Sequence, residues 1–223
     1  MTGVQTCALP ICNPGLTEFF KSLLGLEFTV TFGKNGVVEK VDGREQALQK
    51  LAAVNPQIES VLKRVLTDEA VKEMTDPAAG LTPAAEQTVG GTWERKGVLS
   101  LGPIGSYERT YTYTYKGKDP EKKDLDRVEV KTVVAFKPTS EAGEGLPFKV
   151  KGGTFATKDV KDAKPGVILY NPKTGRVESV RIQLVLTGDL DLTVANADTK
   201  VALYQDQKVE VDTADASLLP AKK

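Results

Sequence analysis

Most of the chain after residue 91 alternates hydrophobic and polar residues with a period of two, the pattern of half-buried β-strands. The run YERTYTYTYKG sets three tyrosines against threonines, and LDRVEVKTVVAF places Val128, Val130, Thr132, Val134 and Phe136 on one face. TWERKGVLSL, PGVILY and RVESVRIQLVL alternate in the same way. Turns are expected at residues 171–175, at Gly188-Asp189 and at NAD, and no helical pattern interrupts the strands. We therefore expect an antiparallel meander.

The first third of the chain begins with a predicted hairpin and then changes period. In residues 26–43, Phe28, Val30 and Phe32 alternate with threonines, and GKNG offers the turn. Beyond it, hydrophobic residues recur every three or four positions, which predicts amphipathic helices. Their expected starts are Asp42, Asn55-Pro56 and Thr67, and the third helix should stop at Asp76-Pro77. The expected buried stripes are Ala47, Leu48, Leu51 and Val54; Ile58, Val61, Leu62, Val65 and Leu66; and Val71 with Met74.

Together these patterns predict an α+β fold. We expect a curved antiparallel β-sheet, a half-barrel-like meander, with two to three helices inserted after the first hairpin. The helices should pack on one face of the sheet, because their hydrophobic stripes need an apolar surface. Residues 77–91, rich in proline, glycine and alanine, read as the connection between the two parts.

The opening MTGVQTCALPIC matches nothing later in the chain and holds both cysteines, Cys7 and Cys12. Their spacing suits no usual redox or metal motif, and a basic region typical of a signal peptide is absent. TGVQTCALPI resembles the in-frame translation of a common short-read sequencing adapter. We therefore expect residues 1–12 to be an artefact, residues 13–215 to form one truncated domain, and 216–223 to be a polar tail. A signal segment or lipid anchor would then have preceded residue 13.

The composition disfavours several classes of function but does not identify one. The 223 residues carry 30 basic and 30 acidic side chains, which disfavours nucleic-acid binding. The chain has no histidine, which removes the commonest general base and metal ligand. The chain has no run of about 20 consecutive apolar residues, the length that a membrane-spanning helix needs. We expect no catalytic residues, no metal and no cofactor.

The tyrosine ladder is the most distinctive candidate for binding. Its rings could line a hydrophobic or sugar-binding surface, or simply pack a strand face against the helices. Trp93, the single tryptophan, reads mainly as a core anchor. Asp189, Asp191 and Asp198 could hold calcium, but three acids across a hairpin are more typical of a solvated face. The candidate ligand-binding residues are Phe28, Phe32, Leu62, Trp93, Tyr111, Tyr113 and Tyr115.

Three motifs resemble an uncharacterised bacterial family of secreted proteins and lipoproteins of unknown function. They are GGTW at residues 90–93, YNPKTGR at residues 170–176 before a long alternating strand, and the hairpin FTVTFGKNGVVEKVDG. The resemblance implies an extracytoplasmic protein of the periplasm or cell surface, and it carries no catalytic residue. The expected architecture is also similar to the half-barrel of lipoprotein carriers of the LolA and LppX type.

Three functions remain open on the sequence. The first is a non-enzymatic envelope protein that binds a lipid or other apolar ligand between sheet and helices. The second is a structural or protein-interaction module of the cell surface with a solid core. The third, a hydrolase that uses carboxylates alone, would need two acids across a cleft. A cavity lined by Phe28, Phe32, Leu62, Tyr111 and Tyr113 would favour the first.

Overall fold

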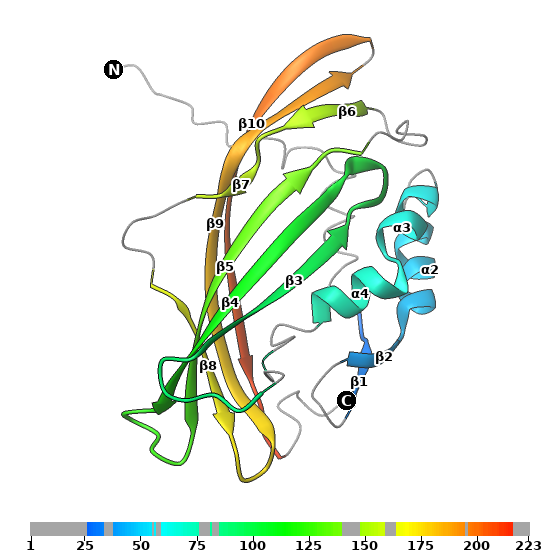
Figure 1. The fold of residues 1–223 in the computed structure, drawn as a ribbon. Helices are drawn as coiled ribbons and strands as arrows, with labels where there is room; N and C mark the ends of the chain where they lie inside the picture. Colours follow the sequence, from blue (N-terminus) through cyan, green and yellow to red (C-terminus); the bar gives the residue numbers. More distant parts are fainter. Residues whose placement is uncertain are drawn as a thin grey trace, which may run out of the picture.

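The computed structural model describes residues 26–33, 38–54, 56, 59–75, 81, 85–139, 148–158, 164–194 and 196–215. These residues form mostly antiparallel strands with three α-helices, in agreement with the predicted class (Figure 1). The first part of the chain contains β1 (Thr29–Phe32), β2 (Val38–Asp42), α2 (Arg44–Val54), α3 (Glu59–Val65) and α4 (Asp68–Thr75). The second part contains β3 (Thr92–Ser100), the 3-10 turn η2 (Gly102–Ile104), β4 (Ser106–Lys118), β5 (Asp126–Lys137), β6 (Phe148–Gly153), β7 (Ala156–Thr157), β8 (Gly166–Asn171), β9 (Arg176–Val194) and β10 (Ala197–Asp212).

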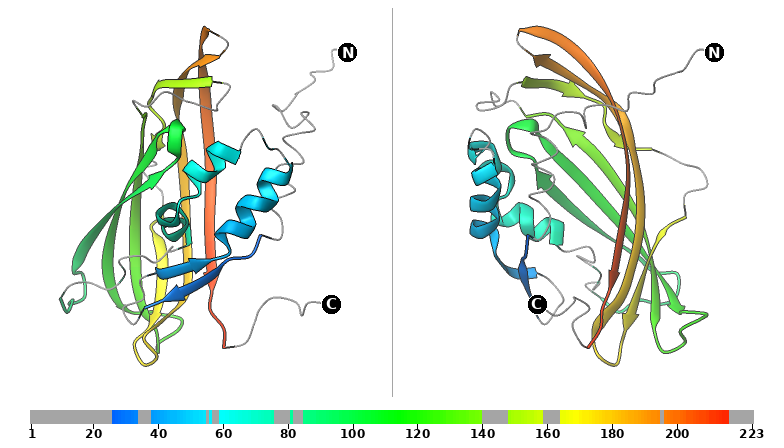
Figure 2. Two further views of the ribbon diagram at one scale, coloured as in Figure 1. Left: turned by 90° about the vertical axis from the view of Figure 1, so that its right-hand side faces the viewer. Right: turned by 180° about the vertical axis from the view of Figure 1, so that it is seen from behind.

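Among the described residues, eight strands form one sheet in the order β10-β9-β7-β5-β4-β3, with β6 paired to β9 and β8 paired to β5 and β9. Every pairing is antiparallel, as the lack of crossover helices predicts. The described sheet is not closed into a barrel, and it curves towards the helices (Figure 2).

One face of this sheet carries the core, because alternate side chains point to it. In β5 the five residues predicted to share a face are all buried. Two clusters lie side by side along the face and share Leu184 as a partly buried neighbour. The first contains Leu81, Tyr113, Val128, Val130, Ile168, Val180 and Ile182, and the second contains Val134, Phe136, Val150, Phe155 and Leu186.

The helices lie on the concave side of the sheet and have a small core of their own (Figure 2). Leu48, Leu51 and Leu62 form that core, so the predicted stripes of α2 and α3 pack mainly against each other. The main contacts with the sheet layer come from α4 on β3 and from α3 on η2. Thus α4 covers the sheet directly, and α2 and α3 form an outer layer.

Several predicted boundaries differ from the structure. The first hairpin forms a separate two-stranded sheet, β1-β2, instead of extending the meander. Gly43, with φ 101°, takes the place expected for Asp42, since its carbonyl accepts the first helical hydrogen bond from Ala47. Helix α3 begins at Glu59, later than the start predicted at Asn55-Pro56. The capping role of Thr67 is confirmed, because its Oγ1 accepts the N–H of Ala70 at 3.1 Å.

The turn expected at Gly188-Asp189 is wrong. Strand β9 continues unbroken through both residues, from Arg176 to Val194. Gly188 adopts φ 151°, and a Cβ there would lie 2.6 Å from the Cα of Phe155. Glycine is required here so that the Thr154–Phe155 backbone can approach the strand, not so that the strand can end.

Some predictions fall on residues outside the described part. They include the adapter-like stretch 1–12, the GKNG turn, the side chains of Phe32, Val54, Val61 and Met74, the position of Ile58, and the tail 216–223. The division into one domain and two flanking segments also stays a prediction.

Candidate functional site

The structure brings four of the candidate ligand-binding residues together and places two others, Leu62 and Phe28, elsewhere. Trp93, Tyr111, Tyr113 and Tyr115 all belong to the first cluster of the sheet. Leu62 lies in the helical core, and Phe28 is 36% exposed outside the three buried clusters. The side chain of Phe32 is not described. The described candidate residues therefore do not line one shared cavity.

The aromatic residues form a stack because β3 and β4 pair in register. Trp93 lies opposite Tyr113, and their rings are 5.4 Å apart and nearly parallel at 16°. Tyr111 follows on the same face, with its ring 6.3 Å from that of Tyr113. Tyr113 is 1% exposed, so the stack is mainly a packed part of the core.

Charged residues extend the aromatic stack towards the helices. The guanidinium carbons of Arg95 and Arg109 each lie 5.9 Å from the centre of the Tyr111 ring, within cation–π range. Both arginines pair with Glu73 of α4, Arg95 at 2.8 Å and Arg109 at shorter range. The three side chains are largely withdrawn from solvent. This Glu73 ion cluster joins the helical layer to the sheet.

These three residues were not predicted from the sequence, although a signal was present. Arg95 and Arg109 occupy the inward positions of alternating strands, next to Trp93, Tyr107 and Tyr111. A charge on the core-facing side of a strand needs a partner, because burying it alone is strongly unfavourable. Period-two patterning could therefore have marked the two arginines, but not Glu73 as their partner.

A groove of about 710 Å³ lies between the helical layer and the connection from β3 to β4. We call it the cationic groove, because three basic side chains and four hydroxyls line it and no described lining residue is acidic. The lining residues are Lys63, Arg64, Thr67, Ser100, Gly102, Gly105, Ser106, Lys137, Pro138 and Thr139. None of them was singled out for binding from the sequence, since they meet only through the tertiary fold.

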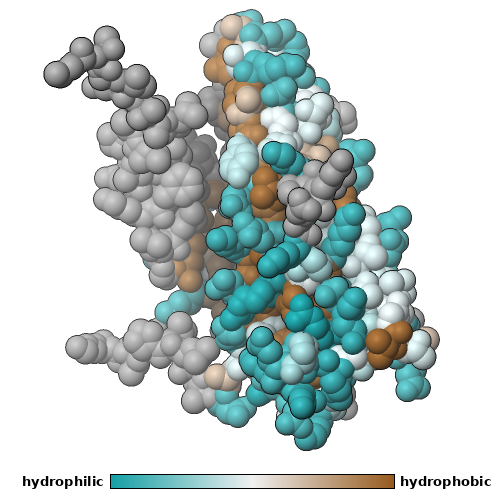
Figure 3. All heavy atoms as spheres, turned by 90° about the vertical axis from the view of Figure 1, so that its left-hand side faces the viewer, coloured by the Kyte–Doolittle hydropathy of each residue, from teal (hydrophilic) through white to brown (hydrophobic). Residues whose placement is uncertain are grey.

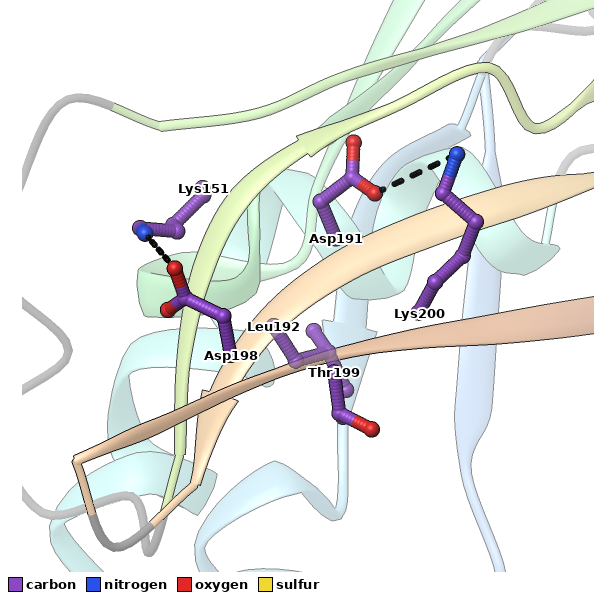
Figure 4. Close-up of a pocket in the computed structure, with 6 residues that line it drawn as sticks. All are labelled: Lys151, Asp191, Leu192, Asp198, Thr199 and Lys200. Carbon is purple, nitrogen blue, oxygen red and sulfur yellow. Dashed lines mark hydrogen bonds and ion pairs between the residues drawn. The ribbon is translucent and has the colours of Figure 1, made fainter.

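A second, smaller cavity of about 430 Å³ lies near the turn that joins β9 to β10 (Figure 4). Its charges satisfy one another: Asp198 accepts a hydrogen bond from Lys151 at 2.6 Å, and Lys200 lies 3.7 Å from Asp191. The hydrogen bond from Lys151 and a second one from Thr193 lower the pKa of Asp198 below its usual range. The lining holds two lysines and two aspartates, so it has no excess of either charge to attract a charged ligand.

The same lysines lie next to the three aspartates that were considered as calcium ligands. Lys200 is near both Asp189 and Asp191, at 4.0 and 3.7 Å, and Lys151 holds Asp198. Across the described residues, no group of three or more cysteine, aspartate or glutamate side chains is arranged to hold a metal ion. The three aspartates thus lie in a surface salt-bridge network.

The side of the molecule away from the helices is mostly hydrophilic, with hydrophobic residues in narrow strips (Figure 3). Among the described residues, the exposed large hydrophobic side chains are spread over different segments of the chain: Phe28, Val89, Val98, Val133, Val194 and Tyr204. Within the described part, no helix is both long and apolar enough to cross a membrane.

Comparison with known proteins places the chain in a family but gives it no activity. No curated protein and no solved structure matches it significantly. One family model, described as a family of unknown function, DUF6263, matches residues 11–175. The matched segment is well over half of the chain and contains the first hairpin, the three helices and the GGTW motif. The chain therefore belongs to DUF6263, a family of unknown function.

Proposed function

We propose that this chain is a non-enzymatic extracytoplasmic envelope module that binds partners at its surface and keeps a solid core. The observation that carries the proposal is the closure of the inner face by its own side chains. Tyr113, Val130, Ile168 and Val180 come from four different strands and are each at most 2% exposed. The hydrophobic side chains on this face pack against one another, so their surface is not available to a ligand.

The geometry favours this function over the binding of a lipid between sheet and helices. An apolar ligand between α4 and β3 would lie against the Glu73 ion cluster. Separating Glu73 from Arg95 and Arg109 in an apolar environment would leave charges buried without partners, which is strongly unfavourable. Leu62 and Tyr113, expected on one cavity wall, also belong to different clusters.

Three of the described carboxylates are poorly suited to act as a general acid. Hydrogen bonds from backbone N–H groups and basic side chains lower the pKa values of Asp119, Glu178 and Asp198. A carboxyl acting as a general acid in glycoside hydrolysis needs its pKa raised instead. The extracytoplasmic location rests on the family resemblance seen in the sequence motifs.

Native mass spectrometry tests the solid core. The full chain, fused to a secretion signal and purified from an envelope fraction, should have the mass of the processed polypeptide alone. Two matched variants are Tyr113→Leu, which changes the inner face, and Thr112→Ala, which changes the opposite face of the same strand. A stoichiometric lipid that disappears in Tyr113→Leu and persists in Thr112→Ala would contradict the proposal and restore the apolar-ligand function.

A further inference from the structure

We propose that the cationic groove binds a ligand through an anionic oxygen group of the phosphate or carboxylate class. The proposal does not depend on the solid core, because the groove lies outside the clusters of the sheet. Its lining combines Lys63, Arg64 and Lys137 with four hydroxyls. Cations with hydroxyl donors are the groups that recognise phosphate and carboxylate oxygens.

Two glycines bring the walls of the groove close together. Gly102 has φ 59°, and a Cβ there would lie 3.2 Å from the backbone carbonyl carbon and oxygen of Arg64. Gly105 has φ 140°, and a Cβ there would collide with the carbonyl oxygen of Lys137. Both glycines therefore permit a backbone approach that any other residue would oppose. The backbone of Arg64 thereby lies close to the first residue of η2, and that of Lys137 lies close to Gly105 at its end.

The hydroxyls are partly fixed in direction. Ser100 Oγ accepts the N–H of Gly102 at 3.2 Å, and Thr67 Oγ1 accepts the N–H of Ala70. A hydroxyl that accepts a hydrogen bond still carries one O–H proton that it can donate. An oxyanion in the groove could accept hydrogen bonds from these O–H groups.

Two of the basic residues at the rim, Lys63 and Lys137, form ion pairs with exposed acids. Lys63 lies 2.7 Å from Glu59, which raises the pKa of Lys63 and keeps it charged. Lys137 lies 3.6 Å from Glu108, and all four side chains are about half exposed. Solvent-exposed pairs of this kind contribute little energy, so a lysine can turn to a ligand at small cost. Because the lysines are exposed to solvent, salt screens their attraction for an anion, and we expect binding to weaken as the salt concentration increases.

Titration of the full chain with inorganic phosphate and with pyrophosphate tests the groove. At low ionic strength we expect saturable binding at one site, measured by calorimetry. Lys137→Gln and Arg64→Gln should each weaken it about tenfold, the loss for one charge-assisted hydrogen bond. Lys151→Gln and Lys200→Gln change the net charge equally at the other cavity and should leave the affinity unchanged. Thermal unfolding checks that every variant is folded.

The result that overturns the proposal is the absence of saturable binding, or an equal loss in the groove and control variants. Flotation with vesicles of phosphatidylglycerol, compared with phosphatidylcholine, separates a free anion from a lipid headgroup as the source of the phosphate. Vesicle binding that Lys137→Gln abolishes would support the site and assign it to a headgroup. Binding to vesicles and to phosphate that no groove variant alters would refute it.

Discussion

Asp119 lies where β4 ends, and its carboxylate organises the following loop. One oxygen accepts the N–H groups of Lys122 at 2.9 Å and Glu121 at 3.0 Å, and the other faces Arg127 at 3.3 Å. The hydrogen bond from Lys122, then that from Glu121, and the nearby Arg127 lower the pKa of Asp119. Asp119 therefore turns a lysine-rich stretch that the sequence marks only as a solvated loop into a defined turn.

The substitution Asp119→Asn should change how stability depends on pH. Because the folded-state pKa lies below the unfolded value of about 3.9, the ionised carboxylate stabilises the fold above that pH. That contribution is lost as pH falls through the folded pKa. Urea unfolding at pH values between 7 and 2 should show the wild type more stable than Asp119→Asn at neutral pH, with the two converging in acid.

Arg127→Gln provides the matched comparison for Asp119. Since the backbone N–H groups are the larger cause of the pKa shift, this variant should keep most of the wild-type pH dependence. A wild-type curve parallel to that of Asp119→Asn over the whole range would contradict the account.

At the scale of elements, the helix ends are held by small local devices. Thr67 caps α4, and Gly43 opens α2 after β2. Helix α4 has only eight residues, so its formation depends on its cap and on burial of Ala70 and Val71. The caps thus orient the helix that carries Glu73.

Thr67→Ala should lower the free energy of unfolding by about 1 kcal/mol, the usual value of an N-cap hydrogen bond. Urea unfolding measures the change, and Thr67→Ser, which keeps the hydroxyl, should stay close to the wild type. If serine and alanine destabilise equally, the methyl group of Thr67 and not its oxygen is what matters.

At the scale of the whole molecule, the helical layer and the sheet are two packed bodies. The helical core contains residues of α2 and α3, and the sheet clusters contain none of them. The Glu73 ion cluster and the contact between α3 and η2 connect the layers. We infer that the helices can open while the sheet stays folded.

Hydrogen exchange should therefore be faster in α2 and α3 than in β5 and β9. Glu73→Gln removes the charge that pairs with both arginines and should lower the opening free energy of the helices by about 1–3 kcal/mol, with little change in the strands. Native-state exchange with mass spectrometry measures both regions in one experiment. Glu94→Gln, on the outer face of β3, is the control. Equal acceleration of helices and strands would show a single cooperative unit instead.

The sequence by itself determined strands β3, β4, β5 and β8, the antiparallel pairing and the helices after the first hairpin. It did not predict β6 and β7, and it divided β9 at Gly188. The predicted elements follow from local periodicity and turn chemistry, which act within a few residues. The same alternation puts Trp93 on the face of the tyrosines once β3 and β4 pair, but it leaves open which tyrosine lies opposite; in the structure it is Tyr113. The sequence also indicated that the tyrosines share a face, but not whether that face is packed or open.

Only the tertiary structure decided what covers that face and where charge gathers. Gly188 looks like a turn signal, yet its freedom serves the close approach of Phe155, a residue 33 positions earlier in the numbering. Glu73 pairs with Arg95 and Arg109, and Lys137 and Arg64 line the same groove, although these residues lie on segments far apart along the chain. Local patterns carry no information on such meetings, because they depend on how the helical layer docks on the curved sheet.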